Sequence, residues 1–467
     1  MTRTIGAGLP ALAAAEPTRP ALVCDDTVLT REMLTARIAT RAALLAQRSA
    51  PGAPIALALG NGPELVDAFF ACAIGGRQAL VYDPAWPAPY RAAIDAALAP
   101  AITLETLPDL ALSTPAPFPP PPAPDAPFYV GFTSGSTGLP KGYRRSHRSW
   151  IDSFKVSAAA FGLGEQDVVL APGGLAASLH LYGVVHALHG GATAVMMRQF
   201  HPRRALRLIA RHGVTAIYAT PTQLQMLIEA GGGERLPTVR LILISGAKWR
   251  AETRAATLAL FPKAGIAEFY GASETSFITL AHPNEAVPAG SVGRAAPGVT
   301  LRIRDAAGRD LPAGEAGAIW VKSTMLFDDY ACGHAPETRR EGGFLTIGDH
   351  GRLDEAGFLY LHGREKRMLV TSGLNVYPEE VESVLVSLPG IAEAAVFGLP
   401  DSLRGVELVA VLRGTFDEPA LRAACRALLP AAKIPRRFLR LEEWPRTSGG
   451  KADLRALEAV AREKFTR

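Results

Sequence analysis

Short apolar stretches alternate along this chain with segments of helical periodicity, and this alternation constrains the fold more than any other feature. Over residues 32–47 the apolar and Ala positions recur at helical spacing, and residues 54–62 have the pattern of a buried strand that ends at a Gly turn. A helical stretch over residues 64–74 and a strand from Gln78 follow. Such alternation predicts a parallel, doubly wound sheet with helices on its faces.

The alternation of strand-like and helical stretches continues through the middle of the chain, and a different pattern follows it. Further strand-like stretches, each followed by helical or loop sequence, begin at Val168, Ala192, Val214 and Arg240. These predict a second α/β unit. After Ser291 short strands separated by Gly and Asp turns indicate a small antiparallel or barrel-like section, and beyond Arg364 strands and helices alternate again.

The length favours more than one packed unit, because 467 residues exceed what one hydrophobic core usually organises. We predict an α/β protein with a large N-terminal body of two doubly wound α/β subdomains plus the barrel-like section, followed by a small, mobile α+β C-terminal domain. The predicted domains are residues 1–364 and 365–467, with a hinge near Lys366.

Composition argues against several classes of protein. The net charge is only +5 and no dense basic tract is present, which argues against nucleic acid as a partner. The cysteines lie far apart without a C-x-x-C pair, so neither a zinc site nor a disulfide framework is indicated, and a reducing cytoplasm fits best. The N-terminal apolar stretch is too broken for a signal peptide, and no segment approaches the ~20 apolar residues of a membrane span.

Residues 133–142, TSGSTGLPKG, follow a predicted strand and combine hydroxyls, glycines and a lysine. Glycines let backbone N–H groups approach phosphate oxygens, hydroxyls add donors, and a lysine supplies a compact positive charge. The spacing differs from that of the kinase-type P-loop, because Pro140 precedes the lysine and Gly142 follows it. The predicted polyphosphate-binding residues are Thr133, Ser134, Gly135, Ser136, Thr137, Gly138 and Lys141.

Together with other segments, this stretch resembles the superfamily of adenylate-forming enzymes, which includes acyl-CoA synthetases, nonribosomal peptide adenylation domains and firefly luciferase. Residues 75–91 are similar to its D-P-x-x-P segment, and residues 268–275 to its Y-G-x-T-E segment. The T-G-D, hinge and terminal-lysine segments have counterparts at residues 346–351, 363–382 and 445–451. The segments come in the family's order and cover nearly the whole chain.

The resemblance implies ATP, Mg²⁺ and coenzyme A as cofactors, and it implies roles for particular residues. Glu274 would hold the Mg²⁺ that bridges ATP phosphates, as hard cations prefer oxygen ligands. Lys451 would stabilise charge during adenylation. The other implied cofactor-binding sites are Tyr270 on adenine, Gly271 beside it, Ser273 at the α-phosphate, Asp349 at the ribose and Arg364 at the ribose or phosphate. Lys366 would be the hinge, and the Gly373 region would approach the thiol channel.

Several positions depart from the family pattern. The usual acyl-gating histidine or aromatic residue has no clear counterpart, since Leu175 lies near that place and His180 farther on. Val370 replaces a second lysine of luciferase-like relatives, but residues 368–378 are similar to the form in fatty acyl-CoA synthetases. His180, His186 and His189 give at best a partial metal-ligand set, and we expect packing or substrate-pocket roles instead.

We therefore expect an AMP-forming acyl-CoA synthetase that activates a carboxylic acid and transfers the acyl group to coenzyme A. A medium-to-long aliphatic acid is favoured, as in fatty acid metabolism, because Gly246, Ala247, Gly271 and Ala272 leave room for an alkyl chain. Lys248 is the objection, since a cation there would pair with a dicarboxylate. The alternatives are a stand-alone enzyme that loads a separate acyl carrier protein and a non-catalytic nucleotide-binding pseudoenzyme.

Overall fold

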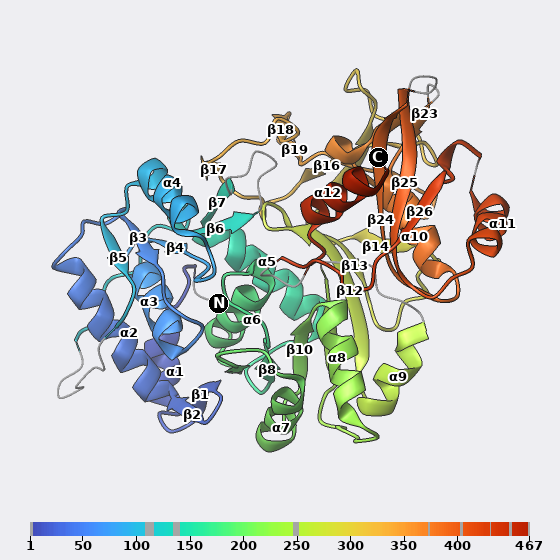
Figure 1. The fold of residues 1–467 in the computed structure, drawn as a ribbon. Coiled ribbons are helices and arrows are strands. Elements are labelled where there is room, and N and C mark those ends of the chain that lie inside the picture. Colours follow the sequence, from blue (N-terminus) through green and yellow to red (C-terminus); the bar gives the residue numbers. More distant parts are fainter. Residues whose placement is uncertain are drawn as a thin grey trace. The chain divides into compact units, whose positions relative to one another are not determined.

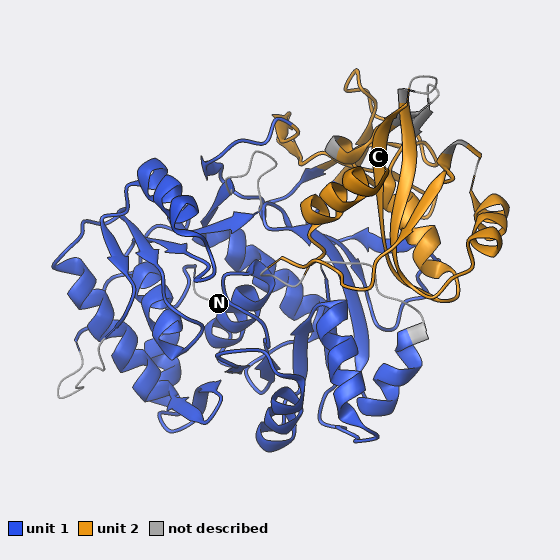
Figure 2. Ribbon diagram, in the orientation of Figure 1, with its two compact units in different colours: residues 1–300, 321–336 blue, residues 301–320, 337–467 orange. Residues whose placement is uncertain are grey.

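The computed structural model describes residues 3–107, 116–133, 141–245, 252–371, 374–401, 405–429, 431–447 and 451–465 (Figure 1). The chain forms two compact units (Figure 2). Unit 1 comprises residues 1–300 and 321–336, and unit 2 comprises residues 301–320 and 337–467. The predicted hinge near Lys366 concerns a motion of the chain and stays a prediction.

One sheet of unit 1 has the strand order β17-β7-β6-β4-β3-β5, with β5, β3, β4 and β6 parallel and the other two strands antiparallel. The strands are β3 (Pro54–Leu57), β4 (Gln78–Val81), β5 (Ile102–Leu104), β6 (Pro127–Thr133), β7 (Lys141–Ser146) and β17 (Tyr330–Cys332). Helix α2 (Arg31–Ala46) precedes β3 in the chain, and α3 (Pro63–Ile74) and α4 (Ala88–Leu98) connect β3 to β4 and β4 to β5. Helices α2 and α3 lie side by side (Figure 1), which buries the apolar α3.

The second sheet of unit 1 follows the order β14-β13-β12-β11-β10-β8-β9-β1-β2, and its central strands are parallel. The strands are β1 (Pro20–Cys24), β2 (Thr27–Thr30), β8 (Val168–Leu170), β9 (Thr193–Met196), β10 (Ala216–Ala219), β11 (Leu241–Ile244), β12 (Gly265–Ala272), β13 (Ser276–Ala281) and β14 (Ser291–Ala295). The helices are α1 (Leu9–Ala15), α5 (His147–Phe161), α6 (Ser178–His189), α7 (Pro202–His212), α8 (Pro221–Gly231) and α9 (Glu252–Leu260). The inward faces of α7 and α8 complete a core with the apolar strands.

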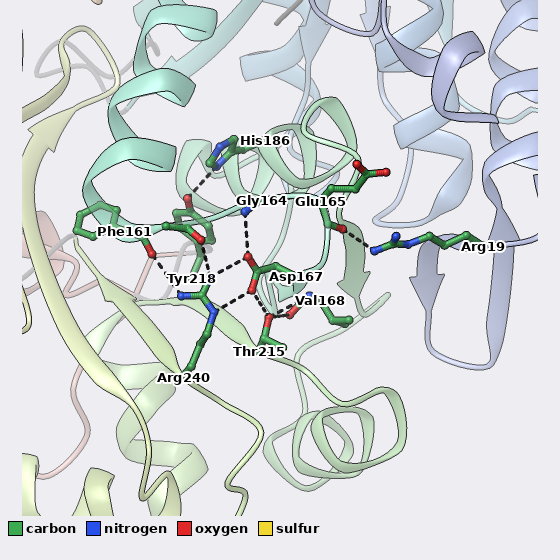
Figure 3. A network of polar contacts seen from close by, with 11 residues as sticks. Arg19, Phe161, Gly164, Glu165, Asp167, Val168, His186, Thr215, Tyr218 and Arg240 are labelled. Carbon is green, nitrogen blue, oxygen red and sulfur yellow. Dashed lines mark hydrogen bonds and ion pairs between the residues drawn. The ribbon is translucent and has the colours of Figure 1, made fainter. Parts of the chain in front are cut away.

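A polar network connects the residues directly before three of these strands, β8, β10 and β11 (Figure 3). Asp167, just before β8, accepts hydrogen bonds from the Thr215 hydroxyl, from the Arg240 guanidinium and from the backbone N–H of Gly164. Arg240 also donates to the carbonyls of Phe161 and Gly162, at the end of α5. The network therefore joins α5 to the starts of β8, β10 and β11.

Unit 2 contains an antiparallel section and a separate three-stranded sheet. The section comprises β15 (Thr300–Arg304), β16 (Gly317–Lys322), β18 (Arg339–Glu341), β19 (Phe344–Thr346), β20 (Asp349–Leu353) and β21 (Phe358–Arg364). After η1 (Glu365–Arg367) come β22 (Leu369–Thr371), β23 (Leu374–Val376), β24 (Ile391–Asp401), β25 (Gly405–Gly414), η2 (Ala431–Lys433) and β26 (Arg437–Arg440). The helices are α10 (Pro378–Ser387), α11 (Glu418–Leu428) and α12 (Leu454–Phe465).

Alternating side chains on β24 and β25 build a core on each face of the three-stranded sheet. Val396 and Leu408 face the side covered by α10 and α11, whereas Phe397 and Val409 face the side covered by α12. Helix α12 lies against β24 and β25 in Figure 1. The charged helical tail predicted from the sequence is this helix.

The α/β fold with a small C-terminal domain of sheet and helix is confirmed. The predicted strands beginning near Val168, Ala192, Val214 and Arg240 correspond to β8 through β11. The strands after Ser291 are short and antiparallel, as the sequence predicted for this section. Within the described ranges, no helix has the length and apolar character needed to cross a membrane.

Candidate functional site

The predicted phosphate-binding segment connects β6 and β7, which form an antiparallel pair. Thr133, the last residue of β6, is the register partner of Lys141, the first residue of β7. Residues 134–140, which contain the predicted sites Ser134, Gly135, Ser136, Thr137 and Gly138, lie outside the described residues. The Thr133 hydroxyl is buried and has no hydrogen-bond partner among the described residues. A buried donor of this kind retains its capacity for a ligand oxygen.

Lys141 and Glu274 meet at the hydroxyl of Tyr330. The Lys141 ammonium lies 3.5 Å from this hydroxyl and 5.1 Å from the centre of the Tyr330 ring. The hydroxyl in turn donates a 2.9 Å hydrogen bond to Oε1 of Glu274. Both ionisable side chains are buried, with 8% of Lys141 and 6% of Glu274 exposed. The structure thus brings together the lysine and the carboxylate that the sequence assigned to ATP phosphates and Mg²⁺.

Glu274 lies in the turn between β12 and β13, and local sterics explain the residues of this turn. Gly271 approaches the carbonyl oxygen of Ser276 so closely that a Cβ atom would lie 1.8 Å from it, which makes glycine necessary. The Ser273 hydroxyl lies 2.9 Å from that of Ser178, at the start of α6. Tyr270 is half-buried on β12, where the adenine contact remains a prediction.

Arg145 is a fully buried cation that fixes the same turn. Its guanidinium donates to the carbonyl of Ser273 at 2.7 Å, to the hydroxyl of Ser276 at 2.7 Å and to the carbonyl of Met325 at 2.7 Å. A fourth bond, from Nε, reaches Ser149 on α5. Burial lowers the pKa of Arg145 to about 10, so the guanidinium remains charged at neutral pH. It joins the Glu274 turn to the segment that leads into β17.

A second group of predicted residues lies in unit 2. Asp349 begins β20 and pairs across the hairpin with Arg364, the last residue of β21, with 3.0 Å between Oδ1 and Nε. Gly348 adopts a φ of 79°, and a Cβ atom there would lie 2.7 Å from the Cβ atom of Glu337. The turn therefore needs glycine before the carboxylate. Asp349 is buried, whereas Arg364 is half-exposed.

Lys451 lies in a segment whose described backbone is held by hydrogen bonds. The carbonyl of Lys451 accepts hydrogen bonds from the N–H and hydroxyl of Thr447, and the N–H of Asp453 donates to Pro445. The pKa of Lys451 is lowered, first by partial burial and then by the positive charge of Arg364. An ammonium in this electrostatic setting is poised to gain from an added anion.

Three other residues named from the sequence lie wholly or partly outside the described part of the structure. The backbone of Lys366 lies in η1, directly after Arg364, but its side chain is outside the described part of the structure. Gly373 and Lys248 also fall outside the described residues. The predicted residues therefore form two groups, one in each compact unit, and their roles stay predictions.

Sequence reasoning missed Tyr330 and Arg145. Arg145 gave no clear signal, because residues 141–146, KGYRRS, are mostly polar in sequence although their strand is largely buried in the structure. Tyr330 gave no local signal, because it follows Asp328 and Asp329 in a loop-like stretch. Its position beside Lys141 depends on the pairing of β17 with β7.

The histidines of α6 are buried in packed surroundings, as expected. His186 stacks on Phe154 with 4.7 Å between the ring centres and shares a 3.2 Å hydrogen bond with the Tyr218 hydroxyl. Burial lowers the pKa of His180 to about 4, that of His186 to about 3 and that of His189 to about 4. All three are therefore neutral at pH 7.

The residues around Glu274 fit Mg²⁺ that binds together with ATP. In the part of the chain that the structure describes, no group of three or more His, Cys, Asp or Glu side chains could hold a metal ion. Mg²⁺ does not require such a group, because it commonly uses one or two carboxylates together with phosphate oxygens and waters. One buried carboxylate, a lysine and an unpartnered hydroxyl at Thr133 match that chemistry.

Comparison with known proteins identifies the family of this chain. Residues 9–331 match the model of the AMP-binding enzyme family, and residues 380–451 match that of the AMP-binding enzyme C-terminal domain. The chain is 40% identical to the uncharacterized acyl-CoA ligase YhfT of Bacillus subtilis over 329 residues, 70% of this chain and 67% of that protein. It is 31% identical to the fatty acid–[acyl-carrier-protein] ligase ScoC of Streptomyces coeruleorubidus, over 93% of this chain and 92% of that protein.

A solved structure extends the similarity to both units. The o-succinylbenzoate CoA synthetase of Bacillus subtilis in complex with its acyl-adenylate intermediate has a TM-score of 0.85 and 28% identity, covering 96% of this chain and 97% of that chain. Another structure of the same synthetase contains ATP and a magnesium ion. Enzymes of this family use ATP with Mg²⁺. The chain therefore belongs to the AMP-binding enzyme family and is an adenylate-forming acid–CoA ligase.

Proposed function

We propose that this ligase activates a medium-to-long aliphatic carboxylic acid in two half-reactions. A carboxylate oxygen of the acid attacks the α-phosphorus of ATP, which gives acyl-AMP and releases pyrophosphate. The thiol sulfur of coenzyme A then attacks the acyl carbon, loses its proton and releases AMP. The observation that carries the proposal is the convergence of Lys141 and Glu274 on Tyr330 at the base of the β6–β7 hairpin.

The residues of unit 1 would bind the triphosphate in this scheme. Lys141 and the hydroxyl of Thr133 would contact phosphate oxygens, and Glu274 would hold Mg²⁺, which neutralises phosphate charge when bound. Ser273 would contact the α-phosphate. Because Arg145 and Ser178 fix Ser273, its position is set before ATP arrives, and this preorganisation reduces the cost of binding.

The residues of unit 2 would bind the ribose and assist the first step. Asp349 would accept hydrogen bonds from the ribose hydroxyls, with Arg364 beside it. Lys451 would offset the negative charges that come together when the carboxylate approaches the α-phosphate. A rotation at Lys366 would then remove Lys451 and bring the Gly373 region to the thiol channel, since a few backbone torsions suffice for such a domain movement.

The aliphatic substrate is the finer part of the proposal. Phe277 and Ile278, which follow the Glu274 turn, are apolar and buried, and Phe277 is the register partner of Gly271 across β12 and β13. Each buried methylene would stabilise an alkyl chain by about 0.8 kcal/mol. The similarity to ScoC, a fatty acid–[acyl-carrier-protein] ligase, supports the same choice. We also keep the cytoplasmic location as part of the proposal, because the described cysteines are all free thiols.

Pyrophosphate exchange with a panel of acids tests this proposal. We expect exchange with hexanoate through palmitate to exceed that with malonate, benzoate and amino acids, and acyl-CoA to form when coenzyme A is added. Activity confined to a dicarboxylate or an aromatic acid would refute the aliphatic assignment. Absence of exchange with every acid would favour the pseudoenzyme alternative.

Two variants test the division of the reaction into halves. Lys451→Ala should cripple acyl-AMP formation but spare thioester formation from supplied acyl-AMP. Lys366→Pro should do the converse, because proline fixes φ and would restrict the hinge. Equal losses in both halves would indicate a structural role for either residue.

A separate acyl carrier protein is the second candidate acceptor, and the full-length similarity to ScoC favours its consideration. To identify the acceptor, preformed acyl-AMP is supplied with either coenzyme A or a phosphopantetheine-bearing carrier protein, and the rate of acyl transfer to each is measured. Faster transfer to coenzyme A would support the main proposal, and transfer to the carrier protein alone would replace it.

A further inference from the structure

Tyr330 occupies the space between the two charged groups of the proposed triphosphate site. The Tyr330 hydroxyl donates to Oε1 of Glu274 at 2.9 Å, and the Lys141 ammonium lies 3.5 Å from the Tyr330 hydroxyl oxygen. The ammonium also lies over the Tyr330 ring, 5.1 Å from its centre. One neutral side chain therefore contacts both groups.

The backbone around Tyr330 is fixed independently of any ligand. Tyr330 pairs with Tyr143 across β17 and β7, so its strand lies directly beside the strand that begins at Lys141. The N–H of Phe327 donates to the carbonyl of Glu274 at 2.7 Å, and Arg145 donates to the carbonyl of Met325. The tyrosine hydroxyl is thus held in place by contacts to both of the segments that it bridges.

We propose that Tyr330 is a positioning residue for MgATP, which holds the Glu274 carboxylate for the metal and the Lys141 ammonium for the phosphates. The inference rests on the proposed function, which assigns those roles to Glu274 and Lys141. A hydroxyl that donates to one carboxylate oxygen fixes the orientation of the carboxylate and leaves the other oxygen for a cation. The ring restrains the ammonium by a cation–π contact without neutralising its charge.

The chain offers a matched set of variants. Tyr330→Phe removes the hydroxyl and keeps the ring, whereas Tyr330→Leu removes both. Tyr360→Phe is the control, since the Tyr360 hydroxyl donates to the carboxylate of Asp354 at 3.1 Å in unit 2 and has no part in the proposed site. It removes the same kind of bond elsewhere in the molecule.

Metal binding is measured directly as well as through activity. Mn²⁺ replaces Mg²⁺ as the probe, and electron paramagnetic resonance counts the bound ion in the presence of a non-hydrolysable ATP analogue. We expect Tyr330→Phe to weaken Mn²⁺ binding about 10- to 100-fold, the range for partners of a metal-ligating carboxylate. The Mg²⁺ concentration for half-maximal pyrophosphate exchange should rise by a similar factor. Tyr330→Leu should raise KM for ATP by a further two- to fivefold or so through the loss of the ring.

The outcomes separate this inference from the proposed function. Mn²⁺ binding by Tyr330→Phe equal to that of wild type and Tyr360→Phe would overturn the inference, even if exchange proceeds normally. Wild-type Mn²⁺ binding by Glu274→Gln would also overturn it, because the metal would then lie elsewhere. A wild-type enzyme that shows no exchange with any acid, but binds Mn²⁺ in a Tyr330-dependent way, would refute the reaction and support the inference.

Discussion

Asp167 and Glu274 are carboxylates of the same unit with the same exposure, 6%, but their surroundings differ. Asp167 accepts hydrogen bonds from a backbone N–H, a hydroxyl and a guanidinium (Figure 3). Glu274 accepts one side-chain hydrogen bond, from Tyr330, and takes part in no ion pair among the described residues. The saturated carboxylate stabilises the fold, whereas the unsaturated one retains acceptor capacity for a ligand.

The pKa of Asp167 reflects this saturation. Burial acts to raise it, but the hydrogen bonds from Arg240, Thr215 and Gly164 outweigh burial and lower the pKa overall. A lowered carboxyl pKa contributes stability that is present above the ordinary value near 4 and is lost as the pH falls through the folded value. The network should therefore remain intact above the ordinary carboxyl pKa.

The largest expected effect is on stability at low pH. The buried histidines should become protonated, and the free energy of unfolding should fall, at a higher pH than that at which Asp167 becomes protonated. Burial lowers the pKa of His147 and of His186 to about 3, and His180 and His189 are similarly depressed. Each buried neutral histidine contributes stability that is complete above pH 6.5 and is lost as the pH falls toward its folded pKa, at roughly 1 kcal/mol per pH unit.

Urea unfolding at pH 7, 6, 5 and 4 measures this loss. The free energy of unfolding should fall by several kcal/mol between pH 6.5 and pH 4, well before Asp167 protonates. His186→Phe, which keeps a ring against Phe154, should make the fall shallower. A stability that stays constant down to pH 4 would contradict the prediction.

Glu274→Gln should give the next largest effect, on activity alone. We expect the adenylation rate to fall about 100-fold or more, because the variant removes the charge proposed to hold the metal. The melting temperature without ligand should stay close to that of wild type, since Gln retains an acceptor for Tyr330. A large drop in melting temperature would place Glu274 with Asp167 as a structural carboxylate.

Arg240→Met should show the opposite pattern. Loss of the guanidinium should lower the free energy of unfolding by about 2 kcal/mol, a value below that for a fully buried pair because 42% of the Arg240 side chain is exposed. The rate of pyrophosphate exchange at saturating MgATP should not change. An exchange defect in a fully folded variant would show that the network also serves the site.

The smallest effects come from a matched pair of threonines. Thr215→Val removes a hydroxyl bonded to Asp167 and should cost about 1 kcal/mol of stability. Thr133→Val removes a hydroxyl without a partner in the described residues and should change stability by less than about 0.5 kcal/mol. It should instead raise KM for ATP. Equal effects on stability would remove the distinction between the two regions.

Much of the fold could be predicted because its signals are local. The apolar runs of β8 to β11 mark buried parallel strands, and α6 shows the apolar character expected of a buried helix. Parts of the candidate site were predictable for the same reason, because Gly271 lies three residues before Glu274 and Gly348 directly before Asp349, and neither position has room for a Cβ atom. At these positions the structural requirement is local, so the residue type in the sequence indicates it.

The sequence by itself determined the elements, the family and the candidate residues from Thr133 to Lys451. Only the tertiary structure decided that Tyr330 lies between Lys141 and Glu274, which are 189 and 56 residues away from it along the chain. It also decided that the buried Arg145 joins the Glu274 turn to Met325. Periodicity and turn chemistry act over a few residues, whereas the pairing of β17 with β7 and the burial of a guanidinium arise when distant segments pack together.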